Sequence, residues 1–258
     1  MASGGVGDPQ SWNRYSYAFN NPLRFTDPTG MEAGDFYDEN GKRLGTDGRN
    51  DGKVYVVTND DQAKQIRDAD KKHGTTQLSE VSSAVELPDA AVRGAIGAAV
   101  DRSNSPTADD TKGGFHEEGI TWGTNASGAE QIIPAVAGPA SNPQKDDHAE
   151  IALSKFVNKA DEGALVSVAG TSHIHPKGEI SVTTGPEAKP GVTVVMGGTT
   201  TTTTYRFNQP PSGRDMANAL SGTTNIVVGA RDKKVYIYDS GGTRATFPLK
   251  QFLSIGRR

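Results

Sequence analysis

The fold is decided by the stretch Ala164-Leu165-Val166-Ser167-Val168-Ala169-Gly170-Thr171-Ser172-His173-Ile174-His175-Pro176. Its apolar first half predicts a buried strand. Residues i and i+2 of an extended chain lie on one face, so His173 and His175 can point at a common atom. We therefore expect both imidazoles at the end of a strand, where a rigid element holds them in place.

A second polar motif, Pro211-Ser212-Gly213-Arg214-Asp215, lies further along the chain. The Asp215 carboxylate would complete a set of two nitrogens and one oxygen, a common catalytic zinc set that leaves a fourth position for water. Ser212 suits the N-cap of a short helix, and a helix that begins there places Ser212 and Asp215 on one face. Three other carboxylates can replace Asp215 in principle, but none follows a Pro-Ser pair: Glu179, Asp232 and Asp239.

Hydrolysis at such a site also needs a base and a donor for the oxyanion. A carboxylate near the ion takes a proton from the water, and a hydroxyl such as that of Ser212 steadies the oxyanion. Glu117 and Glu118 directly precede Gly119; we favour Glu117 as the base and keep Glu118 as the alternative. A zincin helix is disfavoured, because His116-Glu117 is not followed by a second histidine at the required spacing.

The composition narrows the classes of function. With 258 residues, 34% of them apolar, the chain can form a compact core over only part of its length. A formal net charge of −4 does not create the basic field that nucleic acid attracts, so we expect no nucleic acid partner. No apolar run is long enough for a transmembrane helix. Because the chain has no cysteine, any metal must be held by His, Asp or Glu.

Hydrophobic periodicity and turn dipeptides predict an α/β or α+β sandwich. We expect a hairpin region over 35–57 and a linker over 103–113. The expected helices are 60–72, 86–102, an amphipathic helix over 146–160 and a short helix over 216–220. The expected strands are centred on 120–122, 131–133, 164–170, 225–228 and 235–238, before a final segment around 247–253.

The first residues carry a distinct signature. Tyr15, Tyr17 and Phe19 alternate as in a strand, and Asn20-Asn21-Pro22 and Asp27-Pro28-Thr29-Gly30 mark turns. Residues 8–31 resemble the last stretch of the Rhs/YD-repeat core, which closes the repeat shell and precedes a variable C-terminal toxin. Members of that family often cleave themselves after a final Asp-Pro-x-Gly-Leu. Here Met31 replaces the leucine and the upstream partner motif is missing, so we do not expect self-cleavage by this fragment alone.

Residues 112–240 resemble the JAB/MPN (JAMM) metallopeptidase family, and most closely its members that serve as Rhs toxins. The shared order is a glutamate, a helix, an apolar strand, Gly-x-x-His-x-His-Pro and then Pro-Ser-x-x-Asp. The resemblance implies zinc (Zn2+) held by His173, His175 and Asp215, Ser212 on the oxyanion, and Glu117 (or Glu118) as general base. Relatives place the serine soon after the His-x-His-Pro motif, whereas here 35 residues lie between Pro176 and Ser212. The β-prone flanks of 177–210 predict a hairpin insertion beside the site.

Together these resemblances imply three parts: residues 1–31 as the end of the Rhs core, 32–110 as a hairpin and helical connector, and 111–258 as a JAB-like toxin domain with a sheet flanked by helices. The implied function is zinc-dependent hydrolysis of a peptide or isopeptide bond in a target-cell protein. The implied partners are a cognate immunity protein and the Rhs shell of the parent protein, and the implied place of action is the target cell, in its cytoplasm. Two alternatives stay open: a catalytically silent JAB-fold toxin that acts by binding, and a nuclease or nucleotide-modifying Rhs toxin.

Overall fold

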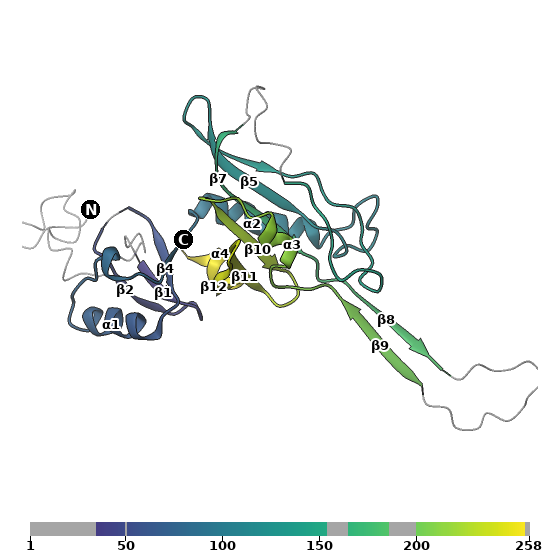
Figure 1. Cartoon of the computed structure of the whole chain (residues 1–258), viewed down its shortest axis with the longest axis horizontal. Helices are drawn as coiled ribbons and strands as arrows, with labels where there is room; N and C mark the ends of the chain where they lie inside the picture. The colour runs from purple at the N-terminus through teal and green to yellow at the C-terminus, as the bar shows by residue number, and fades with distance from the viewer. Residues whose placement is uncertain (1–34, 50, 154–164, 186–199, 256–258) are drawn as a thin grey trace, which may run out of the picture.

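The computed structural model describes residues 35–49, 51–153, 165–185 and 200–255 (Figure 1). These residues form a four-stranded sheet, a six-stranded sheet, a two-stranded sheet and four α-helices. The mixed α/β class expected from the sequence is therefore confirmed. Residues 1–31, which carry the Rhs-like signature, lie outside the described residues. None of the helices described in the structure is long and apolar enough to cross a membrane.

The four-stranded sheet, called the smaller sheet below, has the strand order β2-β1-β3-β4. Its strands are β1 (Asp35–Asp38), β2 (Arg43–Thr46), β3 (Val54–Val57) and β4 (Ala84–Leu87). The expected hairpin is present in β1 and β2, while β3 joins β1 in parallel. Helix α1 (Asp60–Asp70) packs Ile66 on this sheet and begins where the Asn59 side chain accepts a hydrogen bond from the Gln62 N–H. A single 3-10 turn, Leu78–Glu80, precedes β4.

The larger sheet has the strand order β12-β11-β10-β7-β5-β6. Its members in chain order are β5 (Gly119–Asn125), β6 (Glu130–Pro134), β7 (Leu165–His175), β10 (Thr224–Gly229), β11 (Lys234–Asp239) and β12 (Gly242–Pro248). β7 lies inside the sheet, parallel to β10 and antiparallel to β5. The strand that carries both histidines is therefore hydrogen-bonded on both sides, which makes it a rigid support.

Alternation along these strands separates a core face from a polar face. Ile120, Ile174 and Ile226 stand on the core face and are fully buried against helix α2 (Ala90–Ser103). Burying such a side chain contributes roughly 1.5–3 kcal/mol relative to leaving it exposed. Helix α4 (Leu249–Ser254) adds Phe252 to the same core, and Val56 joins it from the smaller sheet. Because side chains alternate, His173 and His175 must face the other side of the sheet.

The sequence-based division placed α2 in the connector that ends at residue 110. In the structure α2 contacts β5, β6 and β7 of the larger sheet as well as α4. The core that supports the histidines therefore includes residues from both sides of that boundary.

The insertion between the two motifs forms a hairpin, as the sequence predicts. β8 (Glu179–Thr184) pairs antiparallel with β9 (Thr201–Arg206) as a separate two-stranded sheet. Cross-strand hydroxyl pairs join Ser181 to Thr204 at 2.9 Å and Thr183 to Thr202 at 3.0 Å. The hairpin projects from the body of the molecule as an arm (Figure 1).

Three local predictions need correction. Residues 146–153 are not helical, because the Asp146 side chain accepts the His148 N–H at 3.0 Å, a turn that competes with a helix start; residues 154–160 lie outside the described residues. The linker 103–113 contains a buried residue, Asp110, which accepts hydrogen bonds from the chain that follows. The short helix expected at 216–220 is α3 (Gly213–Ala217), because Ser212 caps it earlier.

Candidate metal centre

The two histidines share the polar face of β7, as their spacing predicts. The His173 and His175 rings have centroids 5.1 Å apart, and each residue is 5% exposed. They lie within β7 rather than beyond its end, since the strand runs to His175. Gly119 lies opposite His173 on β5, and a Cβ there would meet the Ser172 carbonyl oxygen at 2.7 Å. The neighbouring strand thus approaches the histidines closely.

Helix α3 presents Asp215 to both imidazoles. Asp215 Oδ1 lies 3.1 Å from His173 Nε2, and its Oδ2 lies 3.4 Å from His175 Nε2. The aspartate is held by a capping box: the Ser212 N–H donates to Asp215 Oδ2 at 2.6 Å, and the Asp215 N–H donates to Ser212 Oγ at 3.2 Å. The capping box that starts the helix at Ser212 therefore also aims the Asp215 carboxylate at the histidines.

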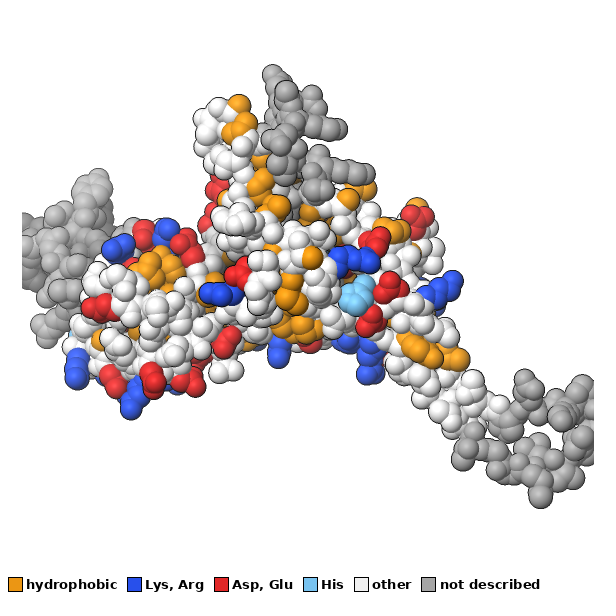
Figure 2. Space-filling view, in the orientation of Figure 1, with side chains coloured by type: hydrophobic (Ala, Val, Ile, Leu, Met, Phe, Trp, Pro, Cys, Tyr) orange, Lys and Arg blue, Asp and Glu red, His pale blue; other side chains and the backbone are white. Residues whose placement is uncertain are grey.

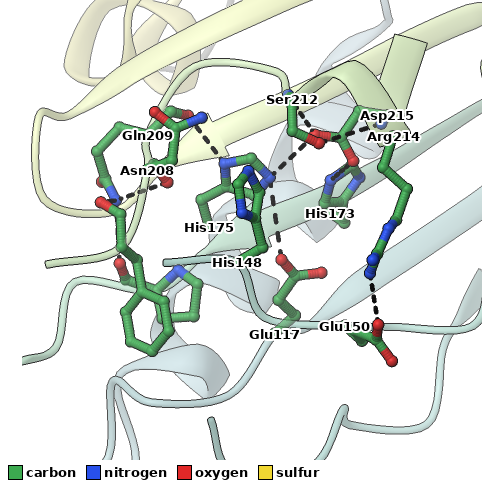
Figure 3. A network of polar contacts seen from close by, with 12 residues as sticks. Glu117, His148, Glu150, His173, His175, Asn208, Gln209, Ser212, Arg214 and Asp215 are labelled. Carbon is green, nitrogen blue, oxygen red and sulfur yellow. Dashed lines mark hydrogen bonds and ion pairs between the residues drawn. The ribbon is translucent and has the colours of Figure 1, made fainter. Parts of the chain in front are cut away.

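Glu117 reaches the same point from the segment before β5. Its Oε1 lies 3.9 Å from His175 Nε2, and the residue is 3% exposed (Figure 3). Glu118 does not join it: its Oε2 accepts from Arg102 Nε at 2.8 Å, on the side of the sheet that α2 covers. The structure thus places Glu117, and not Glu118, beside the histidines.

A backbone carbonyl fixes which nitrogen of His175 faces the site. His175 Nδ1 donates to the Gln209 carbonyl oxygen at 3.1 Å, so in the neutral ring Nε2 carries a lone pair. That lone pair faces carboxylate oxygens of Asp215 and Glu117, which are themselves acceptors. Acceptors converging in a buried place require a positive charge between them, either a proton or a metal ion. Orientation of a ligating histidine through its other nitrogen is also the usual arrangement around metals.

The donor set fits a divalent metal ion such as zinc. Two tetrahedral ligands at zinc's usual bond lengths lie about 3.3 Å from each other. Asp215 meets the two imidazoles through different oxygens, Oδ1 at 3.1 Å from His173 Nε2 and Oδ2 at 3.4 Å from His175 Nε2, and each separation is close to that value. Ligand atoms of Glu117, His173 and His175 also lie within 4.8 Å of one another. The residues present would therefore hold the ion through two imidazoles and a carboxylate, and both Asp215 and Glu117 lie close enough to supply it.

Burial and charge shift the pKa values of the group in opposite directions. Burial raises the pKa of Glu117, and the Asp215 charge adds to this while the two histidines oppose it. For His173, burial lowers the pKa, but the hydrogen bond to Asp215 and the charge of Glu117 outweigh it and raise the pKa overall. Burial also opposes the ionised form of Asp215, yet its bonds to both histidines hold its pKa well below the usual range. The arrangement favours an ionised Asp215 and a Glu117 that takes up a proton readily.

A cavity of about 740 Å³ opens beside these residues. Glu117, His173 and Asp215 line one part of it. The segments 136–139 and 149–153 line another, and Arg214 at the rim forms an ion pair with Glu150 (Figure 3). The polar group is therefore accessible to a ligand much larger than water.

The alternative third ligands are engaged elsewhere. Glu179 pairs with Arg206 on the hairpin, Asp239 pairs with Arg244, and Asp232 accepts a hydrogen bond from the Tyr236 hydroxyl. Of the carboxylates considered from the sequence as a third ligand, Asp215 is the one placed between the histidines.

Sequence reasoning missed two supporting residues. The Gln209 amide donates to the Pro176 carbonyl and accepts from the Arg231 N–H, so it ties both legs of the hairpin to the turn after β10. His116 directly precedes Glu117 in the chain and is fully buried. Its Nδ1 forms a hydrogen bond with the Asp110 carboxylate at 2.7 Å. No residue pattern marks Gln209, and the sequence pattern around His116 and Glu117 points only to a zincin helix, which the missing second histidine disfavours.

No family model matches this chain, and no curated protein or solved structure is detectably similar to it.

Proposed function

We propose that this chain is a zinc-dependent hydrolase that cleaves a peptide or isopeptide bond in a protein. One observation carries the proposal: His173, His175 and Asp215 converge from β7 and α3, with Glu117 beside them, at the wall of a large cavity. These residues are separated by up to 98 positions in the chain, from 117 to 215. Their convergence in a buried place is expensive in desolvation unless a cation neutralises them, and metal chemistry supplies such a cation.

When bound, the ion supplies Lewis acidity, which polarises a carbonyl and makes a water molecule more acidic. Glu117 then acts as base: its buried carboxylate, with a raised pKa, accepts the water proton as the oxygen attacks the carbonyl carbon. The same proton passes from Glu117 to the leaving nitrogen as the C–N bond breaks. The products are a carboxylic acid and an amine, so atoms and charge balance.

Ser212 is the proposed donor to the oxyanion. Its oxygen accepts the Asp215 N–H at 3.2 Å, and its hydroxyl donates to the Asp215 carboxylate until an oxyanion replaces that acceptor. The helix cap and the oxyanion contact are therefore compatible roles for one hydroxyl. The capping box also holds Ser212 next to Asp215, so the donor and the ligand keep a fixed separation.

We further propose that the hydrolase is the C-terminal effector of an Rhs-type toxin. This part depends on residues 8–31 and their resemblance to an Rhs core end. The JAB/MPN relationship depends on the separate resemblance of residues 112–240. A cognate immunity protein, an Rhs shell around the effector and action in the cytoplasm of a target cell follow from the two resemblances together. Expression without the partner should then arrest growth, and co-expression of the neighbouring reading frame should restore it.

The decisive experiment compares proteins from cells that express the wild type or Glu117→Gln. New protein N-termini indicate peptide-bond cleavage, and loss of branched lysine linkages indicates isopeptide cleavage. Either change, seen with wild type and absent with Glu117→Gln, supports the proposal. Purified wild type and Glu117→Gln should both carry about one zinc per chain. Identical proteomes together with undiminished toxicity of Glu117→Gln would sink it.

A further inference from the structure

The cavity beside the metal centre is larger than the proposed chemistry requires. Its volume of about 740 Å³ corresponds to roughly 25 water molecules at their share of liquid volume. It falls within the range of about 300–1,000 Å³ that is typical of binding pockets for organic ligands. An ion and its solvent fill only a small part of it, so the remaining space is available to the substrate.

The wall away from the ligands is apolar. Its larger side chains are Val136, Pro139, Ile151, Leu153 and Leu220. Among the described residues three large apolar side chains are exposed, and two of them line this cavity: Val136 at 76% and Leu220 at 39%. Exposed apolar side chains gathered at a concave site mark a binding surface.

The wall is held by backbone hydrogen bonds to the start of β5 and to the segment directly before it. The Gly138 N–H donates to the Glu117 carbonyl at 2.9 Å, and the Ala135 N–H donates to the Gly119 carbonyl at 2.9 Å. Val136 therefore keeps a fixed place relative to the Glu117 carboxylate. A chain bound at the ligands would extend directly onto this wall.

At the rim, two charged side chains of opposite sign pair with each other. Arg214 is the cation among the lining residues, and Glu150 already pairs with it. Figure 2 shows acidic, basic and histidine side chains close together near the base of the arm, with apolar side chains beside them. A substrate lysine or aspartate held against the apolar wall would lose water without gaining a partner.

We infer that the cavity is a specificity pocket for a polypeptide with a bulky apolar side chain, such as Leu, Ile or Phe, next to the scissile bond. This inference rests on the proposed hydrolase and adds its substrate class. The scissile carbonyl lies at the ligands, and the neighbouring side chain lies against Val136 and Leu220. The contrast between a fitting and a charged side chain should be about 10-fold or more in kcat/KM.

The first test uses a library of proteome-derived peptides, the zinc-loaded full chain and mass spectrometry of the cleavage sites. Enrichment of Leu, Ile or Phe beside the bond, at least several-fold over Gly, Asp and Lys, supports the pocket. Cleavage with no apolar preference overturns it while leaving the hydrolase intact. Val136→Asp should raise KM for apolar peptides about 10-fold with kcat little changed. Val166→Asp is the matched control, because Val166 is 65% exposed and does not line the cavity.

A second measurement separates the pocket from the hydrolase. A fluorescent tetrapeptide, Gly-Leu-Phe-Gly, is titrated against Glu117→Gln protein by anisotropy. Binding that weakens about 10-fold in the Val136→Asp background, but not in the Val166→Asp background, supports the pocket even if no peptide is ever cleaved. Equal binding in the two backgrounds, or none in either, overturns it.

Discussion

Glu117 and Glu118 are consecutive residues whose carboxylates serve opposite faces of the larger sheet. Glu117 Oε1 lies 3.9 Å from His175 Nε2, while Glu118 Oε2 accepts from Arg102 Nε on α2 at 2.8 Å. One carboxylate is therefore available for chemistry, and its neighbour holds the core helix to the strand. Of the two glutamates that the sequence leaves open, Glu117 is therefore the one that lies near the histidines.

The two glutamates should accordingly respond differently to the same substitution. Glu117→Gln should lower kcat by a factor of about 10²–10⁴ with zinc content unchanged, since it removes a proton acceptor that is not one of the three ligands. Glu118→Gln should leave kcat near the wild-type value and lower Tm slightly, because the Arg102 contact loses its charge. Steady-state kinetics, metal analysis and thermal melts check both. The reverse result, with Glu118→Gln inactive, would reassign the base.

Gln209 should control metal affinity without touching the metal. Its side chain bonds the Pro176 carbonyl and the Arg231 N–H, and so fixes the carbonyl that orients His175. Gln209→Leu should weaken zinc binding about 10–100-fold, as loss of an outer hydrogen-bond partner typically does. Competition titration with a zinc chelator measures this. Asn208→Ala is the control, because that exposed amide bonds only the Pro210 carbonyl; an equal loss in both variants would mean general loosening of the loop.

Ser212→Ala should separate fold from chemistry. Loss of the cap on α3 should lower the free energy of unfolding by about 0.5–2 kcal/mol. Loss of an oxyanion donor should lower kcat by about 10²–10³. Ser212→Thr keeps both the hydroxyl and the capping oxygen and should recover much of each loss. Stability restored by threonine without any recovery of kcat would assign Ser212 a purely structural role.

Acid should destabilise the segment that delivers Glu117. Burial would raise the pKa of Asp110, but its hydrogen bonds from His116 and from the Phe115 and Gly113 N–H groups outweigh burial and lower the pKa. A folded pKa below the unfolded value of about 3.9 gives stability that is present above that pH and lost as pH falls through the folded pKa.

Asp110→Asn should therefore be less stable than wild type near neutral pH, and the difference should shrink as the pH falls below about 4. Urea unfolding at several pH values measures it. The exposed Asp109→Asn is the matched control and should follow the wild-type curve. A difference between Asp110→Asn and wild type that stays constant down to pH 2 would contradict the ionic role of Asp110.

Much of the fold follows from periodicity in the sequence. The alternation around Ile174 predicts both the buried strand and the common face of His173 and His175, because a strand has only two faces. The capping-box pattern likewise predicts that Asp215 lies beside Ser212, because both residues belong to the first turn of one helix. Such features depend on neighbouring residues, and single-sequence reasoning reaches them.

The rest depends on contacts between distant segments. Nothing near Gln209 in the sequence shows that its carbonyl will meet His175, since the contact spans 34 positions. Residues 146–153 fail as a helix because Asp146 turns the chain and the Asp147 carbonyl accepts from Asn208, a tertiary contact that overrides the apolar period. The sequence favours Glu117 and keeps Glu118 as the alternative; what separates the two in space is the contact of Glu118 with Arg102 on α2.

The hydrogen bonds of the Gln209 side chain fasten the projecting β8–β9 arm at the end nearest the histidines. Both strands of the β8–β9 hairpin are held where they leave the body of the molecule. Movement of the rest of the hairpin therefore need not displace the His173 and His175 side chains. Doubling the length of a flexible loop adds only about 0.6 kcal/mol of closure entropy. The arm can therefore change in length and sequence. Such changes alter the surfaces that the arm contacts, while the positions of His173, His175 and Asp215 stay the same.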